Sequence, residues 1–259
     1  MLMKFALVDG QKIEAAKGLK GVCPVCQQTV IAKCGNYKIN HWAHKSLAHC
    51  DRWWENETEW HRNWKNIFPI EWLEIVATDE KTGEKHIADI KTYCDMVIEF
   101  QHSNISEEER ISRENFYKNM VWIVDGTRRK RDFKHFFEAF EYNNIWRIGE
   151  NSSLWVLEYG HNYFPKEWQH SQVPVIFDFK GLLDRDEESY DIASIRKPLW
   201  CLLPITGQNT NVLFKFDRNN LVEMVKGGGF VFKYQEIIKI VNQTIQYRYY
   251  YRRRLGYYY

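Results

Sequence analysis

Two acidic residues, Asp89 and Glu99, stand in neighbouring apolar segments of the stretch HIADIKTYCDMVIEFQ, residues 86–101. Residues 93–95 are expected to reverse the chain, which makes this stretch a pair of short strands. Side chains alternate across a strand, so Glu99 and Gln101 share one face. Carboxylates offered from adjacent strands to one side of a sheet suit a hard divalent cation such as Mg²⁺ or Mn²⁺. The pattern therefore predicts the core of a metal-dependent phosphodiesterase.

The segment RWWENETEWHRNWKNIF, residues 52–68, is expected to be a helix because its tryptophans recur at helical spacing. Glu57, His61 and Lys65 fall at successive four-residue steps, so their side chains should follow one helix face. In isolation such a face is usually solvated. Beside the two acidic strands it would offer Glu57 as a further metal ligand and His61 to orient a phosphate or a ligand.

The first fifty residues are expected to form a separate zinc-ribbon-like module. Asp9-Gly10 separates two short strand-like segments and predicts a tight hairpin. Cys23 and Cys26 form a Cys-x-x-Cys knuckle, and His41 and His44 follow downstream. Pairs of thiolate and imidazole ligands suit tetrahedral zinc. A unit this small buries too little apolar surface to be stable alone, so a bound metal is expected to stabilise its fold. These four residues are the predicted zinc ligands.

The His-x-x-His spacing is shorter than in common Cys2His2 fingers, so other ligands stay open. Cys34, His49 and Cys50 are possible substitutes. The alternative to a zinc site is a set of buried free cysteines beside a pair of surface histidines that bind no metal. A redox Cys-x-x-Cys is disfavoured because no βαβ pattern surrounds it.

The elements that must position the acidic strands follow from apolar runs and capping signals. Residues 70–77 and 121–124 are expected to be strands, and Ser106 with Glu109 forms a capping box that should begin a helix. The order helix, strand, two hairpin strands, helix, strand predicts an α/β core with a mixed sheet over residues 51–150. On the second helix, Arg113 and Tyr117 lie one turn apart and are expected to face the site together.

The remainder, residues 151–259, is expected to be an α/β extension that ends in a basic aromatic tail. Strands are predicted over residues 154–158, 173–179 and 212–216, and a helix over residues 217–225. The tail IQYRYYYRRRLGYYY alternates tyrosine with arginine, which suits phosphate contact and base stacking but is also compatible with an end that has no role.

Composition agrees with a folded protein and leaves the partner open. The chain has 259 residues, 44% of them hydrophobic, and a formal net charge of +2, which neither demands nor excludes nucleic acid. No apolar stretch is long enough to cross a bilayer, so a cytoplasmic protein is the default expectation. In a reducing compartment its six cysteines are expected to bind metal or stay free.

Several of these motifs occur in an order that resembles the competence protein CoiA family. The series runs CPVC, HWAH, Glu57-Thr-x-x-His61, Ala-Asp89, Ile-Glu99-Phe-Gln101-x-Ser, the capped helix and then VWIV, and it covers about residues 5–126. The resemblance implies a restriction-endonuclease-like fold of the PD-(D/E)XK type that acts on DNA, behind a zinc-binding N-terminal segment.

Carried over residue by residue, the resemblance makes Asp89 and Glu99 the acidic metal ligands. Glu57 and His61 would be the helix motif, and Gln101 would occupy the place of the superfamily's lysine. Glutamine is neutral and positions only through hydrogen bonds, so a cation from elsewhere would have to stabilise charge on the phosphate. Lys91, on the strand face of Asp89, and Lys65, on the Glu57 face, are the candidates.

The DNA-contacting residues are expected among the basic and aromatic side chains. Arg113 would neutralise a non-bridging phosphate oxygen, with Tyr117 beside it. A basic stretch after the last core strand offers further phosphate contacts, although such stretches are usually solvated turns. Its members are Arg128, Arg129, Lys130 and Arg131.

Two other classes of function remain open. One is a catalytically weak or inactive DNA-binding or recombination-mediator protein with the same fold, which metal-dependent cleavage would distinguish. The other is a zinc-stabilised interaction module that works through a protein partner in an uptake or defence assembly. Strand preference and oligomeric state are not indicated by any motif.

Overall fold

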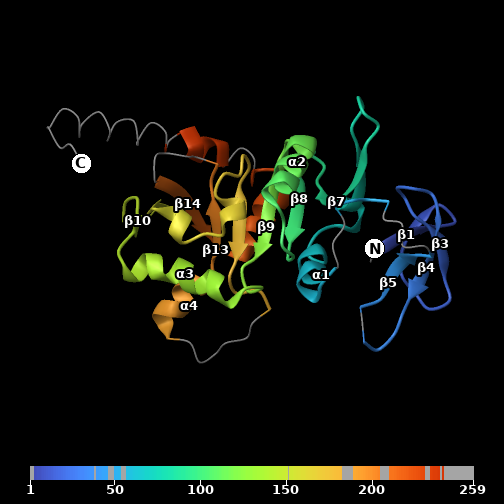
Figure 1. Ribbon diagram of the computed structural model, residues 1–259, viewed down its shortest axis with the longest axis horizontal. Coiled ribbons are helices and arrows are strands. Elements are labelled where there is room, and N and C mark those ends of the chain that lie inside the picture. Colours follow the sequence, from blue (N-terminus) through green and yellow to red (C-terminus); the bar gives the residue numbers. More distant parts are fainter. Residues whose placement is uncertain are drawn as a thin grey trace. The chain divides into compact units, whose positions relative to one another are not determined.

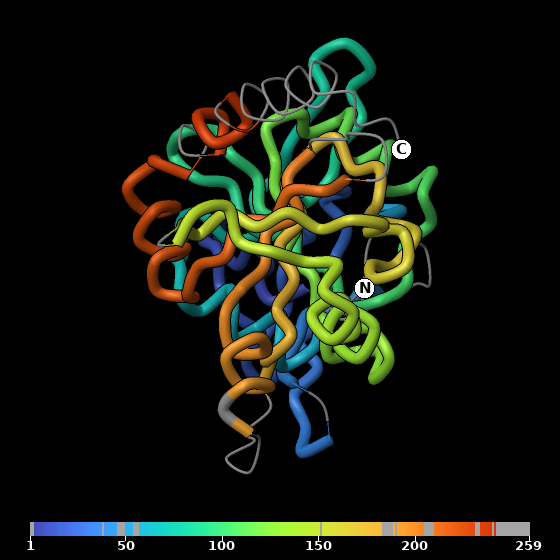
Figure 2. The backbone as a smooth tube through the Cα atoms, turned by 90° about the vertical axis from the view of Figure 1, so that its left-hand side faces the viewer, coloured from blue at the N-terminus to red at the C-terminus, as the bar shows by residue number. Residues whose placement is uncertain are grey.

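The computed structural model describes residues 3–37, 39–45, 50–53, 57–150, 152–182, 189–204, 210–230, 234–239 and 241. The chain divides into two compact units, Met1–Arg128 and Arg129–Tyr259. This division differs from the three ranges expected from the sequence, which stay a prediction. Figure 1 labels the elements and Figure 2 traces the path of the chain.

The first unit begins with a small antiparallel sheet of five strands in the order β2-β1-β3-β4-β5. The expected hairpin is confirmed, because Asp9 and Gly10 take positive φ angles of 51° and 76° at its turn. The strands are β1 (Phe5–Val8), β2 (Gln11–Glu14), β3 (Lys20–Val22), β4 (Thr29–Lys33) and β5 (His41–His44).

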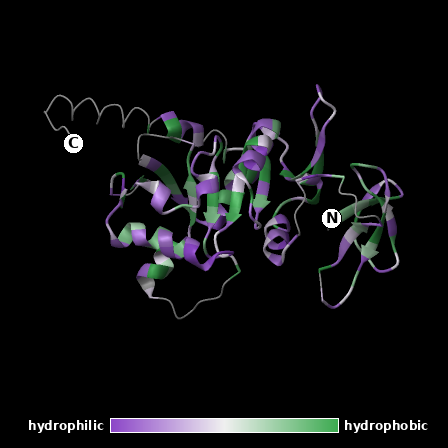
Figure 3. Ribbon diagram, viewed as in Figure 1, coloured by the Kyte–Doolittle hydropathy of each residue, from purple (hydrophilic) through white to green (hydrophobic). Residues whose placement is uncertain are grey.

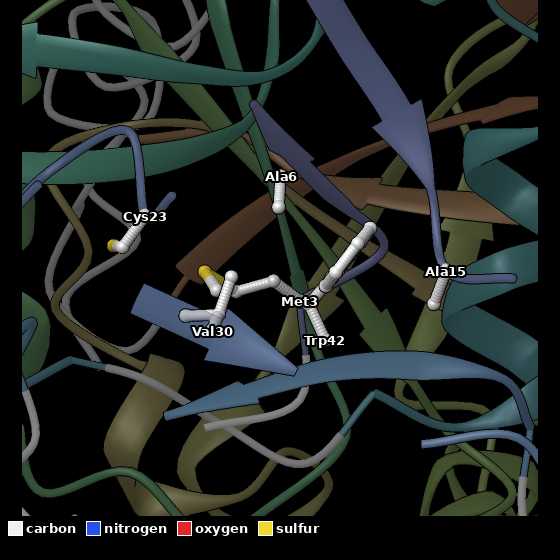
Figure 4. Close-up of a cluster of buried hydrophobic side chains, with 6 residues drawn as sticks. All are labelled: Met3, Ala6, Ala15, Cys23, Val30 and Trp42. Carbon is white, nitrogen blue, oxygen red and sulfur yellow. The ribbon is translucent and has the colours of Figure 1, made fainter. Parts of the chain in front are cut away.

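Trp42 is the centre of the core of this sheet. Its side chain is fully buried, and its indole Nε1 donates to the Ile13 carbonyl at 2.9 Å. Met3 and Val30 pack beside it (Figure 4). Strands β1 and β3 approach closely at Gly21, where an added Cβ would lie 3.0 Å from the Leu7 carbonyl oxygen. The core is small, as expected for a unit that needs a metal staple.

The rest of the first unit is an α/β layer with a mixed sheet, as predicted. Strands β6, β7 and β8 pair antiparallel, whereas β8 and β9 run parallel and are connected through α2. Apolar residues follow the strands in Figure 3. The elements are α1 (Glu59–Lys65), a 3₁₀ turn η1 (Ile70–Trp72), β6 (Leu73–Thr78), β7 (Lys85–Lys91), β8 (Val97–Gln101), α2 (Glu107–Tyr117) and β9 (Met120–Asp125).

Helix α1 is shorter than the predicted helix over residues 52–68. Thr58 is its N-cap, and its hydroxyl accepts from the His61 amide at 3.3 Å, so the helix begins at Glu59. Glu57 therefore precedes the helix, and the predicted stack of three side chains on one helix face is wrong at this position. The buried side of α1 carries Trp60 and Trp64, which pack on Phe100 of β8.

The second unit contains strands in the order β10-β11-β14-β13-β12, with helices α3, α4 and α5. Helix α5 begins after its N-cap Asp217, close to the helix predicted over residues 217–225, whereas β10, α4 and β13 were not predicted. Phe136 and Trp200 are fully buried in its aromatic core. The elements are α3 (Lys130–Glu141), β10 (Ile145–Arg147), β11 (Leu154–Glu158), η2 (Gly160–Asn162), η3 (Lys166–Trp168), β12 (Val175–Asp178), α4 (Tyr190–Arg196), β13 (Leu199–Leu202), β14 (Thr210–Phe216) and α5 (Arg218–Lys226). Over the described residues, no helix has the length and apolar character needed to cross a bilayer.

Candidate functional site: a carboxylate pocket and a Cys/His cluster

Three carboxylates form a row across strands β6, β7 and β8. Glu74 lies opposite Asp89, because the residues on both sides of them are paired in the ladder of β6 and β7. Asp89 and Glu99 follow the last pair of β7 with β8, Ile90 with Ile98, where that ladder ends. Directly opposite residues share a sheet face. Glu74, which has a positive φ of 45°, was not singled out in the sequence. A single glutamate within an apolar strand gives no signal that it belongs to a site.

Several backbone amides around this row donate hydrogen bonds to carboxylate side chains and not to carbonyls of the neighbouring strand. The Asp89 amide donates to Glu99 Oε1 at 3.1 Å, and the Phe100 amide donates to Asp89 Oδ2 at 2.9 Å. The Ile87 amide donates to Asp51 Oδ2 at 2.9 Å. Strands β7 and β8 therefore stop pairing at this level, and their amides fix the orientation of the carboxylates.

Lys65 of α1 places its ammonium among the carboxylates. Its Nζ lies 2.8 Å from Asp89 Oδ1, 3.2 Å from Glu74 Oε1 and 3.5 Å from Glu57 Oε1. Burial by itself lowers the pKa of Lys65, but these three carboxylates outweigh it and hold that pKa well above its usual value. The ammonium therefore stays charged although the side chain is only 5% exposed.

Arg113 and Tyr117 of α2 both line the pocket, as expected from their spacing. Arg113 NH1 lies 3.4 Å from Glu99 Oε2, and NH2 donates to the Trp53 carbonyl at 2.6 Å and also contacts Glu109. Its side chain is 4% exposed. In this arrangement Arg113 holds Glu99 and does not present its guanidinium at the surface.

His61 ties α1 to β8. Its Nε2 donates to the Phe100 carbonyl at 2.8 Å, and its Nδ1 lies 2.9 Å from Thr58 Oγ1 in a reciprocal capping box. The imidazole lines the pocket but uses both nitrogens in these contacts. Burial by itself raises the pKa of the neighbouring Asp89, but the Lys65 ammonium outweighs it and keeps that pKa below its ordinary value, with a smaller effect from His61.

Two of the predicted catalytic residues do not line the pocket. Gln101 is buried, and its amide Nε2 donates to the Ser103 carbonyl at 3.2 Å. Lys91 pairs with Asp95 at 3.1 Å beside the turn between β7 and β8. Of the two lysines considered from the sequence, the structure brings Lys65 and not Lys91 to the carboxylates.

The pocket has more acidic than basic groups. Its cavity of about 60 Å³ has room for a few water molecules or a hydrated ion and is far too small for a nucleotide. Lys65, Arg113 and His61 line it beside five carboxylates, of which Glu57 is also paired with Arg62 and Asp51 with His86. Burial, followed by the charge of Asp89, raises the pKa of Glu99 well above its usual value. The five are Asp51, Glu57, Glu74, Asp89 and Glu99.

The predicted cradle of three carboxylates is not formed. Over the described residues, Glu57, Asp89 and Glu99 do not bring three ligand oxygens within 4.8 Å of one another. Glu57 is instead bound by Arg62 and faces Lys65. The expectation that Glu57 completes the metal site is therefore corrected.

The predicted phosphate-contacting residues of the basic stretch differ in their surroundings. Arg129 pairs with Asp132 at 2.9 Å and with Glu167 at 2.6 Å, so its charge is already matched within the second unit. Lys130 and Arg131 are exposed in the first turn of α3, and Arg128 is half-buried. The tail over residues 245–259 lies outside the described residues.

A second group of candidate ligands lies in the N-terminal sheet. Cys23, Cys26, His44 and Cys50 bring one ligand atom each within 4.8 Å of one another. Cys23 Sγ lies 3.6 Å from Cys50 Sγ, and Cys26 Sγ lies 3.2 Å from His44 Nε2. Tetrahedral zinc with Zn–S of about 2.3 Å and Zn–N of about 2.0–2.1 Å would give edges of about 3.8 and 3.6 Å. The Cys3His cluster could therefore bind zinc.

Cys50 takes the place that His41 was predicted to fill. His41 and His44 are three residues apart on β5, and residues three apart on a strand point to opposite faces. His41 is buried away from the cluster, with Nδ1 2.8 Å from the Ile39 carbonyl. Cys50 was one of the alternatives left open, whereas Cys34 is not in the cluster and His49 lies outside the described residues.

The cluster also carries a charge that suits a cation. The hydrogen bond from Cys50 lowers the pKa of Cys23 to about 5, against the effect of burial. The same hydrogen bond raises the pKa of the Cys50 thiol. A thiolate is the form of cysteine that binds metal. Cys50 is followed directly by Asp51, which lines the carboxylate pocket, so one short segment of chain contributes to both sites.

Comparisons with known proteins give two family matches. The N-terminal domain of competence protein CoiA matches residues 7–52, and the nuclease-like domain of competence protein CoiA matches residues 83–164. The resemblance noted in the sequence is confirmed by both. Neither the curated proteins nor the solved structures contain a match.

Proposed function

Because the chain matches both domains of the competence protein CoiA family, we propose that it is a metal-dependent DNA nuclease with its centre at Asp89 and Glu99. The observation that carries the proposal is the buried row of carboxylates at the point where β7 and β8 separate. Within the pocket, Glu74, Asp89 and Glu99 face Lys65 and Arg113, and a bound cation would balance the remaining carboxylate charge.

The proposed architecture is the restriction-endonuclease-like PD-(D/E)XK core. Support comes from the order of elements: a helix, three antiparallel strands that carry the acids, a crossover helix and a parallel strand. Asp89 stands in the place of the superfamily's aspartate, and Glu99-Phe-Gln101 in the place of its (D/E)XK motif.

We assign Mg²⁺ or Mn²⁺ to the pocket, held by Asp89 and Glu99. Both carboxylates are oxygen donors of the kind that these hard cations prefer. The raised pKa of Glu99 means that this position already favours a positive charge, which a proton supplies when no metal is bound. A bound cation would lower the pKa of a water nucleophile and neutralise charge on the phosphate.

The neighbouring residues have positioning roles. Lys65 replaces the missing lysine of the motif, because its ammonium contacts Asp89 at 2.8 Å while Gln101 turns to Ser103. Arg113 holds Glu99, and His61 fixes the backbone of β8 through the Phe100 carbonyl. Zinc in the Cys3His cluster would be structural and would hold Asp51 at the wall of the pocket.

Since the cavity admits no nucleotide, the DNA backbone would pass across its mouth. Lys130 and Arg131, which are exposed, and Arg128 are proposed to contact DNA phosphates. Such contacts are not specific for base sequence, and removing them would weaken DNA binding and reduce its salt dependence.

The proposal is tested with zinc-loaded protein, plasmid and single-stranded DNA, and Mg²⁺ or Mn²⁺. Asp89→Asn and Glu99→Gln keep the side-chain shapes but remove the charges, so cleavage should fall by about a hundredfold or more. Glu71→Gln removes a charge from an exposed residue nearby and should cleave as wild type does. Equal nicking by wild type and both site variants would reject the assignment. Binding of DNA without cleavage by any of them would favour the non-catalytic alternative.

A further inference from the structure

The Lys65 ammonium lies beside Asp89 among three carboxylates. Its Nζ contacts carboxylate oxygens from three elements: β7, β6 and the segment before α1. The distances from Nζ to these oxygens are 2.8, 3.2 and 3.5 Å. The ammonium has carboxylate acceptors at hydrogen-bond distance on Asp89 and Glu74, and Glu57 adds a longer ion-pair contact.

Glu74 holds this arrangement from the opposite side. Its Oε1 accepts from the Lys4 amide at 3.0 Å, and its Oε2 accepts from the Phe5 amide at 3.1 Å. The N-terminal end of β1 therefore fixes the Glu74 carboxylate against Lys65. If the ammonium leaves, two buried carboxylates and the partly buried Asp89 are left facing one another, which costs free energy because nothing then balances their charge.

We propose that Lys65 supplies the second positive charge of the centre, so that the pocket takes one divalent cation per chain, at Asp89 and Glu99, and not two. This inference rests on the proposed function. It adds that Asp89 is shared between the metal and Lys65, and that Glu74 is a positioning residue for the lysine. The N-terminal strand, through its two amides, becomes part of the catalytic centre.

The inference predicts what happens when the ammonium is removed. Lys65→Met keeps the length of the side chain but leaves the oxygens of Glu57, Glu74 and Asp89 around an empty position. These oxygens do not all lie within 4.8 Å of one another in the wild type, so the three carboxylates should draw together, for want of a countercharge, around a second divalent cation. Lys65→Arg keeps the positive charge and should still exclude it. The double variant Lys65→Met with Glu74→Gln removes one ligand and should return the count to one.

Metal counting tests this without any measurement of cleavage. Zinc-loaded protein is titrated with Mn²⁺, free Mn²⁺ is followed by electron paramagnetic resonance, and the ions bound by Asp89→Asn are subtracted as background. We expect one pocket ion for wild type and Lys65→Arg, two for Lys65→Met and one for the double variant. Thermal unfolding checks that each variant is folded.

Two pocket ions in wild type, or only one in folded Lys65→Met, would overturn the inference. If Lys65→Met does not fold, the wild-type count still decides between one ion and two. A wild-type count equal to that of Asp89→Asn is a different result. It would mean that no cation binds at the pocket, and it would reject the proposed function itself.

Discussion

The exchange of one predicted zinc ligand for another gives a sharp test of the N-terminal site. Cys50→Ala removes a member of the Cys3His cluster, whereas His41→Ala removes a buried histidine that lies outside it. Both substitutions remove a side chain of a type that binds zinc, and both lie in the N-terminal module. The geometry predicts opposite results for them, because His41 and His44 point to opposite faces of β5.

The expected size of the effect follows from the number of ligands. A four-ligand structural zinc site provides about 10–16 kcal/mol of binding free energy, which is roughly 3 kcal/mol per ligand. Since about 1.4 kcal/mol corresponds to a factor of ten, Cys50→Ala should weaken zinc binding by about a hundredfold. His41→Ala loses one hydrogen bond to the Ile39 carbonyl, so it should destabilise the fold by about 1 kcal/mol and leave zinc affinity close to that of wild type.

The assay is competition for Zn²⁺ against a chromogenic chelator, with zinc content measured on the purified proteins. His44→Ala serves as a second cluster variant and should behave as Cys50→Ala does. Retention of zinc by Cys50→Ala together with loss by His41→Ala would refute the reasoning from strand alternation. It would restore the ligand set first expected from the sequence.

Three further predictions concern stability. Gly21→Ala should cost about 1–3 kcal/mol because its Cβ would press on the Leu7 carbonyl and Trp42, whereas Gly35→Ala meets nothing within 4 Å and should be nearly neutral; urea unfolding compares them. The raised pKa of Glu99, caused by burial and then by Asp89, means that metal-free wild type loses stability as the pH rises above about 4.5 and through that pKa. Glu99→Gln, or saturating Mn²⁺, should abolish this loss in thermal melts recorded across pH. The pKa of Asp125 is shifted in the opposite direction: burial raises it, but hydrogen bonds with His102 and Thr127 outweigh burial and lower it. The stabilisation that Asp125 contributes is therefore present above about pH 3.8 and is lost as the pH falls further. Asp125→Asn should therefore be less stable than wild type at neutral pH, by about 1–3 kcal/mol, and the difference should shrink in acid; a constant difference at all pH values would contradict the assignment.

The pair Asp89 and Glu99 could be placed from the sequence because only local rules were needed. Strand alternation and a turn over residues 93–95 bring the two carboxylates to the point where the ladder of β7 and β8 ends, and Asp95 takes a positive φ of 57° at that turn. Helix α2 could also be predicted from the sequence, because the Ser106 cap and the spacing of Arg113 and Tyr117 are local signals.

Residues that depend on tertiary contacts were not predictable in the same way. Glu74 belongs to the site because the amides of Lys4 and Phe5, some seventy positions earlier, bind its carboxylate. Lys65 was found for a partly incorrect reason, since the helix that carries it begins only after Glu57. The error at His41 arose because the segment HWAH was not assigned to a strand, and the strand's alternation separates its two histidines.

The turn of Gln101 towards Ser103 also needed the structure. The sequence places a glutamine where the superfamily has a lysine. It offers two replacements, Lys65 and Lys91, and does not decide between them. Only the packing of α1 on β8, through Trp60 and Trp64 against Phe100, brings Lys65 over the carboxylate row. That packing makes the proposed nuclease centre a composite of a helix, three strands and the N-terminal strand.

Anomalous diffraction from a crystal soaked in Mn²⁺ tests the central claim most directly. The account predicts a single strong manganese peak in the pocket, within bonding distance of Asp89 and Glu99, with the Lys65 ammonium still beside Asp89. A pocket without such a peak at saturating Mn²⁺, or a peak bound only by residues outside it, would contradict the account.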